Sequence, residues 1–105
     1  MQNAIETEVV AAGSVAQNGT AVITRGAAPA RTGAGVYTLT LDRDIDAAEC
    51  VVHVTPRTTP DIAPSVVQTS DTIKTVNMRT IAAAPAAADC EFDFVITRIS
   101  GGVGR

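Results

Sequence analysis

Alternation of apolar and polar residues with a period of two constrains the fold of this chain more than any other feature. In residues 90–99, Phe92, Phe94 and Ile96 fall on one side, and acidic residues, valine and threonine fall on the other. Residues 36–42 alternate in the same way. Successive side chains of a β-strand point to opposite faces of its sheet, so this period predicts half-buried strands.

The residue types in these runs also favour strands. The chain contains two Phe, one Tyr and no Trp, and its only leucines are Leu39 and Leu41, so valine, isoleucine, threonine and alanine supply most of its apolar surface. β-branched residues lose side-chain freedom in a helix but pack well on a pleated sheet. Residues 82–89 have a helix-favouring composition, but Pro85 lies in their middle and predicts a loop. We expect little or no helix.

These patterns predict an all-β fold, an antiparallel β-sandwich of about seven or eight strands, with a jelly roll as one form that it could take. Asn18-Gly19 predicts a hairpin with a type I′ turn between the first two strands. The loops are expected at residues 27–35, which mix Pro, Gly and Ala, at residues 56–64, which hold three prolines, and at residues 82–89. The expected strands are residues 8–16, 21–26, 36–42, 50–55, 65–70, 72–81 and 90–99.

The length of 105 residues predicts a single domain, residues 1–105, with a short N-terminal arm at 1–6 and a flexible glycine-rich tail at 100–105. Each large side chain that is fully buried contributes roughly 1.5–3 kcal/mol, and this chain has few of them. Self-association would compensate for such a small core, so we expect a homo-oligomer.

The charge excludes one class of partner. The formal net charge is −3, and the single lysine, Lys74, belongs to no basic cluster, so we expect no binding to nucleic acid. The first 16 residues carry two glutamates and no basic residue before their apolar stretch, which is the wrong pattern for a secretory signal. No apolar stretch is long enough to cross a bilayer, so we expect a soluble protein without a membrane partner.

Residues 35–57 concentrate the groups that suggest chemistry. Asp42, Asp44 and Asp46 have the spacing that opens a calcium-binding loop. The rest of that loop is missing, because Ala47 stands where the sharp turn needs glycine and His53 stands where a bidentate glutamate is needed. The alternative is a polar connection whose aspartates accept hydrogen bonds from nearby backbone amides. We predict that alternative, and no metal site.

The two cysteines and the single histidine are the candidate catalytic groups. Cys50 and His53 are three residues apart, so on one strand they point to opposite faces and cannot form a nucleophile–base pair. A pairing of His53 with Cys90 or with a serine across strands stays open. A single disulfide between the cysteines also stays open, although two buried thiols are expected in a reducing compartment. The glycines lack the spacing of a phosphate-binding loop. We therefore predict no catalytic, cofactor-binding or metal-binding residue, no cofactor and no enzymatic activity.

Three segments carry a family resemblance: "TGAGVYTLTLDRDIDAAECVVHVTPR", "SVVQTSDTIKTVNMRT" and "DCEFDFVITRI". Over roughly residues 8–99 they resemble the small β-rich domains of tailed-bacteriophage virion surface proteins, the capsid decoration or cement proteins and the head fibres. The resemblance implies a trimeric or otherwise symmetric β-sandwich that is attached to a virion and acts by binding alone. It supplies no catalytic residues.

The resemblance leads to a functional hypothesis. The chain is expected to be a non-enzymatic decoration or cement protein, synthesised in the cytoplasm of a host bacterium and located on the virion. Its expected partners are its own copies, with a trimer favoured, and the major capsid protein or other virion proteins. The alternative is a tail, baseplate or fibre component that contacts a host receptor. A sugar-binding module or a small hydrolase forms a third class.

Overall fold

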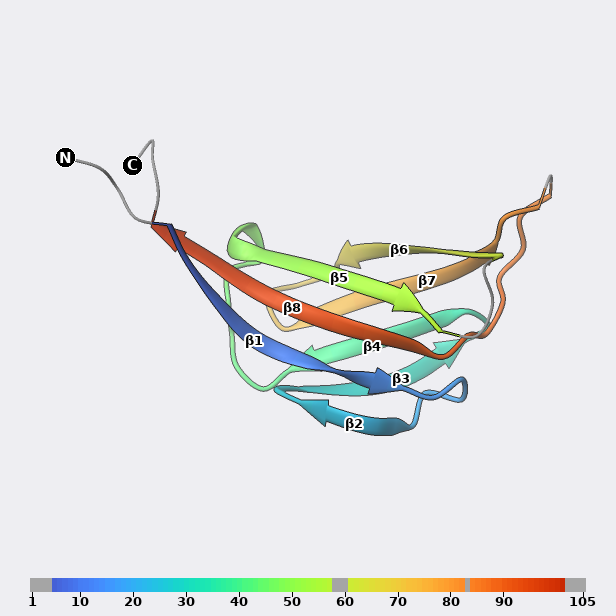
Figure 1. The fold of residues 1–105 in the computed structure, drawn as a ribbon, viewed down its shortest axis with the longest axis horizontal. Helices are drawn as coiled ribbons and strands as arrows, with labels where there is room; N and C mark the ends of the chain where they lie inside the picture. The colour runs from blue at the N-terminus through green and yellow to red at the C-terminus, as the bar shows by residue number, and fades with distance from the viewer. Residues whose placement is uncertain (1–4, 58–60, 83, 102–105) are drawn as a thin grey trace.

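The computed structural model describes residues 5–57, 61–82 and 84–101, which form two antiparallel four-stranded sheets (Figure 1). One sheet has the order β2-β1-β8-β5 and the other has the order β3-β4-β7-β6. A single short 3₁₀ turn, η1, is the only helical element in the described ranges. The elements are β1 (Ile5–Val15), β2 (Ala21–Arg25), β3 (Ala27–Gly33), β4 (Val36–Leu41), η1 (Ala47–Glu49), β5 (Cys50–Pro56), β6 (Ile62–Gln68), β7 (Ile73–Thr80) and β8 (Phe92–Gly101).

The predicted all-β antiparallel sandwich with seven or eight strands is therefore confirmed. The topology differs from that of a jelly roll, in which β2 would pair with β7 and β3 with β6. Here β2, β3, β5 and β6 are the four edge strands, and the central pairs are β1 with β8 and β4 with β7. The first and last strands of the chain thus lie together in the middle of one sheet.

The core is built from the inward faces that the period of two predicted. Tyr37 and Leu39 of β4 face Phe92 and Phe94 of β8, and all four side chains are buried. The ring of Tyr37 meets the ring of Phe92 edge-on, with 5.2 Å between their centroids. Such an edge-to-face pair is a favoured aromatic geometry. The three aromatic residues of the chain therefore hold the two sheets together.

Two predictions about local structure were wrong. Residues 27–33 form the edge strand β3 and not a loop, because an edge strand tolerates the missing backbone donor of Pro29. The β1–β2 turn is not type I′, since only Gly19 has a positive φ, of 90°, while Asn18 does not. The backbone N–H of Gly19 donates to Ala16 O at 2.8 Å, as in a type I turn followed by a left-handed glycine.

The other expected loops need smaller corrections. In residues 56–64, Pro56 ends β5 and Ile62–Pro64 begin β6, both of them edge strands, whereas residues 58–60 lie outside the described residues. The described part of 82–89 forms no strand, as predicted.

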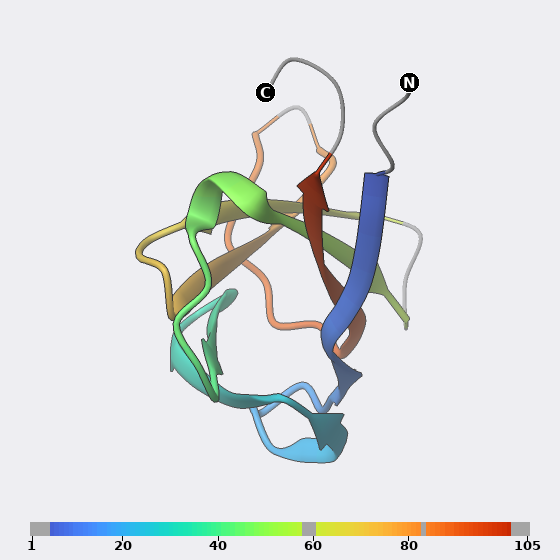
Figure 2. The ribbon, with the colours of Figure 1, turned by 90° about the vertical axis from the view of Figure 1, so that its left-hand side faces the viewer.

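Parts of the predicted terminal arm and tail belong to strands. Ile5 and Glu6 belong to β1, where they pair with Gly101 and Ser100 of β8. The two ends of the described chain therefore lie side by side, as Figures 1 and 2 show. The remaining parts of the predicted arm and tail, residues 1–4 and 102–105, lie outside the described residues.

Candidate functional site

Asp46, one of the three aspartates of the 42–46 connection, accepts a hydrogen bond from the backbone. The chain crosses here from β4 in one sheet to β5 in the other. The carboxylate of Asp46 caps η1 by accepting from Ala48 N at 3.0 Å, and Asp71 accepts from Ala47 N at 3.0 Å. The bond to Asp46 is of the kind that the polar alternative predicted for this connection. Within residues 5–57, 61–82 and 84–101, no three His, Cys, Asp or Glu side chains are grouped so that they could hold a metal ion.

His53 and the two cysteines do not come together. His53 lies on the outer face of the first sheet, opposite Val95, and is exposed. Cys50 is buried on the other face of β5. Cys90 is buried beside Tyr37, just before β8 begins. Cys50 pairs with Arg98, which lies toward the other end of β8. The eight residue steps from Cys90 to Arg98 correspond to about 26 Å of extended chain, too far for a disulfide, and both cysteines are thiols.

The hydroxyl of Tyr37 is a junction between three distant segments. It donates to Gln17 O in the β1–β2 turn at 2.6 Å and accepts from the buried backbone N–H of Cys90 at 3.1 Å. Burial raises the pKa of Tyr37, and the bond from Cys90 partly opposes that rise. Tyr37 therefore holds the β1–β2 turn and the segment before β8 in a fixed relation.

Asp89 forms a second junction beside the first. Its Oδ1 accepts from Arg31 Nε at 3.0 Å and from Gly35 N at 2.8 Å. The bond from Arg31, and after it the bond from Gly35, hold the pKa of Asp89 below its usual value. The same bond to Asp89 raises the pKa of Arg31. The edge strand β3, the β3–β4 turn and the segment before β8 are thereby joined at one point.

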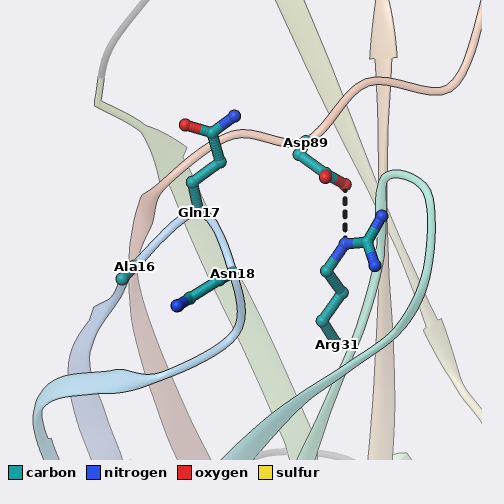
Figure 3. Close-up of a pocket in the computed structure, with 5 residues that line it drawn as sticks. All are labelled: Ala16, Gln17, Asn18, Arg31 and Asp89. Carbon is teal, nitrogen blue, oxygen red and sulfur yellow. Dashed lines mark hydrogen bonds and ion pairs between the residues drawn. The ribbon is translucent and has the colours of Figure 1, made fainter.

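These two junctions surround an open depression at one end of the sandwich (Figure 3). Arg31 and Asp89 form one side of the depression, and the β1–β2 turn forms the other. The side chains of its lining residues carry amides, a guanidinium and a carboxylate, which can donate and accept hydrogen bonds but include no nucleophile beside a base. Its lining residues are Ala16, Gln17, Asn18, Arg31 and Asp89.

The outer face of the first sheet is a second candidate surface. We call this the aliphatic face, and its members are Val9 of β1, Val51 of β5, and Val95 and Ile99 of β8. Val9 and Val51 flank Thr97 in one cross-strand row, and Val95 and Ile99 share the face of Thr97 because they are two residues from it. Val9 is 61% exposed, and Val95 and Ile99 are exposed as well. This group of exposed aliphatic side chains makes the face a candidate contact surface.

Lys74 is a feature that sequence reasoning missed. Its side chain is 0% exposed, and its Nζ donates to Ser70 O at 2.9 Å and to Asp71 O at 3.4 Å. The available signal was the alternation in β7, because Val76 and Met78 are buried and Lys74 shares their phase. Its ammonium group ties the β6–β7 turn, which begins as predicted near Ser70, to the end of the core.

The described residues thus define a β-sandwich with a polar depression at one end and an aliphatic face on one sheet. Comparison with known proteins gave no matching family model, no matching curated protein and no matching solved structure. No helix in the described part of the chain is long and apolar enough to cross a membrane.

Proposed function

We propose that this chain is a non-enzymatic structural protein of a tailed-bacteriophage virion, which binds the capsid surface as a decoration protein and stabilises the shell. The sequence resemblance motivates the proposal, and the antiparallel β-sandwich agrees with it. The separation of His53 from the buried thiols supports a role in binding and not in catalysis.

The observation that carries the proposal is the aliphatic face. In the cross-strand row of this face, Thr97 lies between Val9 and Val51, and none of the three residues is charged. The buried centre of a protein–protein contact is depleted in charged residues in the same way. We assign this face to the capsid subunits.

Binding of this kind stabilises a shell by mass action. A partner that binds only the assembled state lowers its free energy by RT ln(1 + [L]/Kd). A decoration protein that bridges neighbouring subunits would therefore raise the temperature at which the shell opens. The oligomer that the resemblance implies, with a trimer favoured, would present several aliphatic faces at once and increase this effect.

Co-sedimentation with undecorated capsids of the parent phage tests the assignment. The variant Val9→Lys places a charge on the aliphatic face, and we expect it to lose capsid binding while its thermal unfolding stays close to that of the wild type. The matched control is Val67→Lys on the outer face of β6, because Val67 has a similar exposure, 55% against 61% for Val9. The control should bind normally.

Equal binding by both variants would remove the aliphatic face from the proposal. Absence of the wild-type chain from the shell of purified particles would contradict the proposed function itself. So would turnover of an ester substrate that disappears in His53→Ala.

A tail, baseplate or fibre component that contacts a host receptor is the second candidate. The polar depression favours it, because fixed donors and acceptors on an open surface suit a polar ligand. Copy number separates the two candidates. A decoration protein should be present in proportion to the capsid subunits, and a tail component should be present in few copies for each particle.

A further inference from the structure

We propose that the polar depression is a binding site for a neutral saccharide. The inference goes beyond capsid binding and does not depend on which part of a virion carries the chain. The lining residues carry polar groups that make no hydrogen bond within the described part of the fold.

Several polar atoms around the depression make no hydrogen bond with the described residues. Asp89 uses Oδ1 for both Arg31 and Gly35, which leaves its Oδ2 as an acceptor. Arg31 uses Nε, which leaves its two terminal nitrogens as donors. Asn18 accepts from Thr20 N with its Oδ1 and keeps its amide donors, and the side-chain amide of Gln17 is unused. Figure 3 shows the terminal nitrogens of Arg31 and the amide of Asn18 turned away from the space between the turn and Asp89, so the Gln17 amide and Asp89 Oδ2 are the donor and acceptor that a ligand would meet first.

These groups are held in place before any ligand arrives. The turn that carries Gln17 is fixed by Tyr37, and Asp89 is fixed from two directions by Arg31 and Gly35. Gly19 packs so closely on β3 that an added Cβ would lie 2.6 Å from Arg31 N. A site that is ordered in advance loses less conformational entropy on binding.

The charges select the class of ligand. Arg31 and Asp89 neutralise each other at 3.0 Å, so the site has no net attraction for a phosphate or a metal cation. A carboxylate oxygen can instead accept from one hydroxyl, while a neighbouring N–H group donates to the next hydroxyl. Adjacent hydroxyls that both donate and accept are the property of saccharides. No aromatic ring lines the depression, so binding would rest on hydrogen bonds.

The expected affinity is low for one site. Each hydrogen bond on such an exposed surface contributes little net free energy, so three or four bonds correspond to a Kd of about a millimolar. Many copies on one particle would raise the effective affinity by multivalency. A weak site on a repeated protein can therefore still attach a particle to a glycan-covered surface.

Titration of the ¹⁵N-labelled full chain, followed by NMR, tests the proposal. The probes are neutral trisaccharides of glucose, galactose and mannose, with inorganic phosphate and triglycine as separate arms. We expect at least one trisaccharide to shift the backbone amides of Gly35 and Asp89 and the side-chain amides of Gln17 and Asn18. We expect phosphate and triglycine to leave them in place.

Two variants give the quantitative test. Gln17→Ala removes an amide that holds nothing in the fold, and Arg31→Lys keeps the charge but loses the planar fork. Each should raise the Kd about fivefold, the equivalent of one hydrogen bond. Arg43→Lys is the control, because Arg43 forms an equivalent exposed ion pair with Glu8 at 2.8 Å away from the depression.

Four results would overturn the inference. They are no shift with any trisaccharide, shifts that lie on the aliphatic face, a stronger response to phosphate or to triglycine, and an unchanged Kd in both variants. None of these results would bear on capsid binding, because the titration uses the isolated chain.

Discussion

Tyr37 shows how much of this fold depends on single polar atoms. Its ring belongs to the core, while its hydroxyl satisfies two backbone groups from segments that are 20 and 53 residues away in the sequence. Lys74 does the same at the other end of the core, where its ammonium group binds two turn carbonyls. A buried donor that loses its acceptor costs more than the hydrogen bond contributes. The polar groups of Tyr37 and Lys74 therefore fix the turns and the segment that they bind.

Tyr37→Phe should destabilise the protein by about 1–3 kcal/mol, because it removes the hydroxyl that accepts from the buried N–H of Cys90 and donates to Gln17 O. The midpoint of urea unfolding measures the change. Thr40→Val is the control, because Thr40 also loses a hydroxyl but is exposed on a neighbouring part of β4. Similar midpoints for Tyr37→Phe and the wild type would show that the hydroxyl is dispensable.

Acid should remove the contribution of Asp89. Its pKa in the folded protein lies below the usual 3.8, first because of the hydrogen bond from Arg31, so its ionised form stabilises the fold. That stabilisation is complete above the unfolded-state pKa and is lost as the pH falls from about 3.8 through the lower folded-state pKa. Asp89→Asn should be less stable than the wild type at neutral pH, and the difference should shrink in acid.

Urea unfolding over a series of pH values measures this difference. Asp44→Asn is the control, because Asp44 lies on the 42–46 connection away from the depression and makes no ion pair with the described residues. A difference between Asp89→Asn and the wild type that stays constant down to strongly acid pH would contradict the role of the Asp89 carboxylate.

At the scale of elements, the sequence predicted seven of the eight described strands and missed the edge strand β3. β4 and β8 alternate because one face of each lies on the core, and a period of two reports that burial directly. The edge strand β3 has mostly exposed side chains and contains Pro29, so it carries no alternation to detect. The depression was missed for the same reason, because its residues come from β3, a turn and a loop.

The β3–β4 turn offers a matched pair of glycines. Gly35 has a φ of 68°, and a Cβ there would lie 2.5 Å from Met78 O, whereas a Cβ on Gly33 would meet nothing within 4 Å. Gly35→Ala should therefore destabilise the protein by more than about 1 kcal/mol, and Gly33→Ala should be neutral or slightly stabilising. Thermal unfolding of the two variants measures the contrast. Equal melting temperatures would mean that the turn can adopt another conformation.

At the scale of the whole molecule, the topology makes folding depend on distant contacts. The centre of the first sheet is the pair of β1 and β8, so residues from the two ends of the chain must meet before that sheet is complete. The second sheet combines two local hairpins, β3–β4 and β6–β7. The two hairpins are joined because β4 pairs with β7. All-β folds with such long-range pairing refold in about milliseconds to seconds. The sequence pattern predicted the strands but could not predict this pairing, because alternation reports burial and not the partner of a strand.

A circular permutant tests this dependence. Joining residue 105 to residue 1 and opening the chain between Arg43 and Asp44, both exposed in the 42–46 connection, converts the pair of β8 and β1 into a local hairpin. The loop that must close between Gly101 and Ile5 falls from the 95 residues 6–100 to the eight residues 102–105 and 1–4. Loop-closure entropy then decreases by about 2 kcal/mol. Stopped-flow refolding should be faster, by up to about thirtyfold if this pair forms in the transition state. A permutant that is equally stable but refolds at the rate of the wild type would show that β1 and β8 pair after the rate-limiting step.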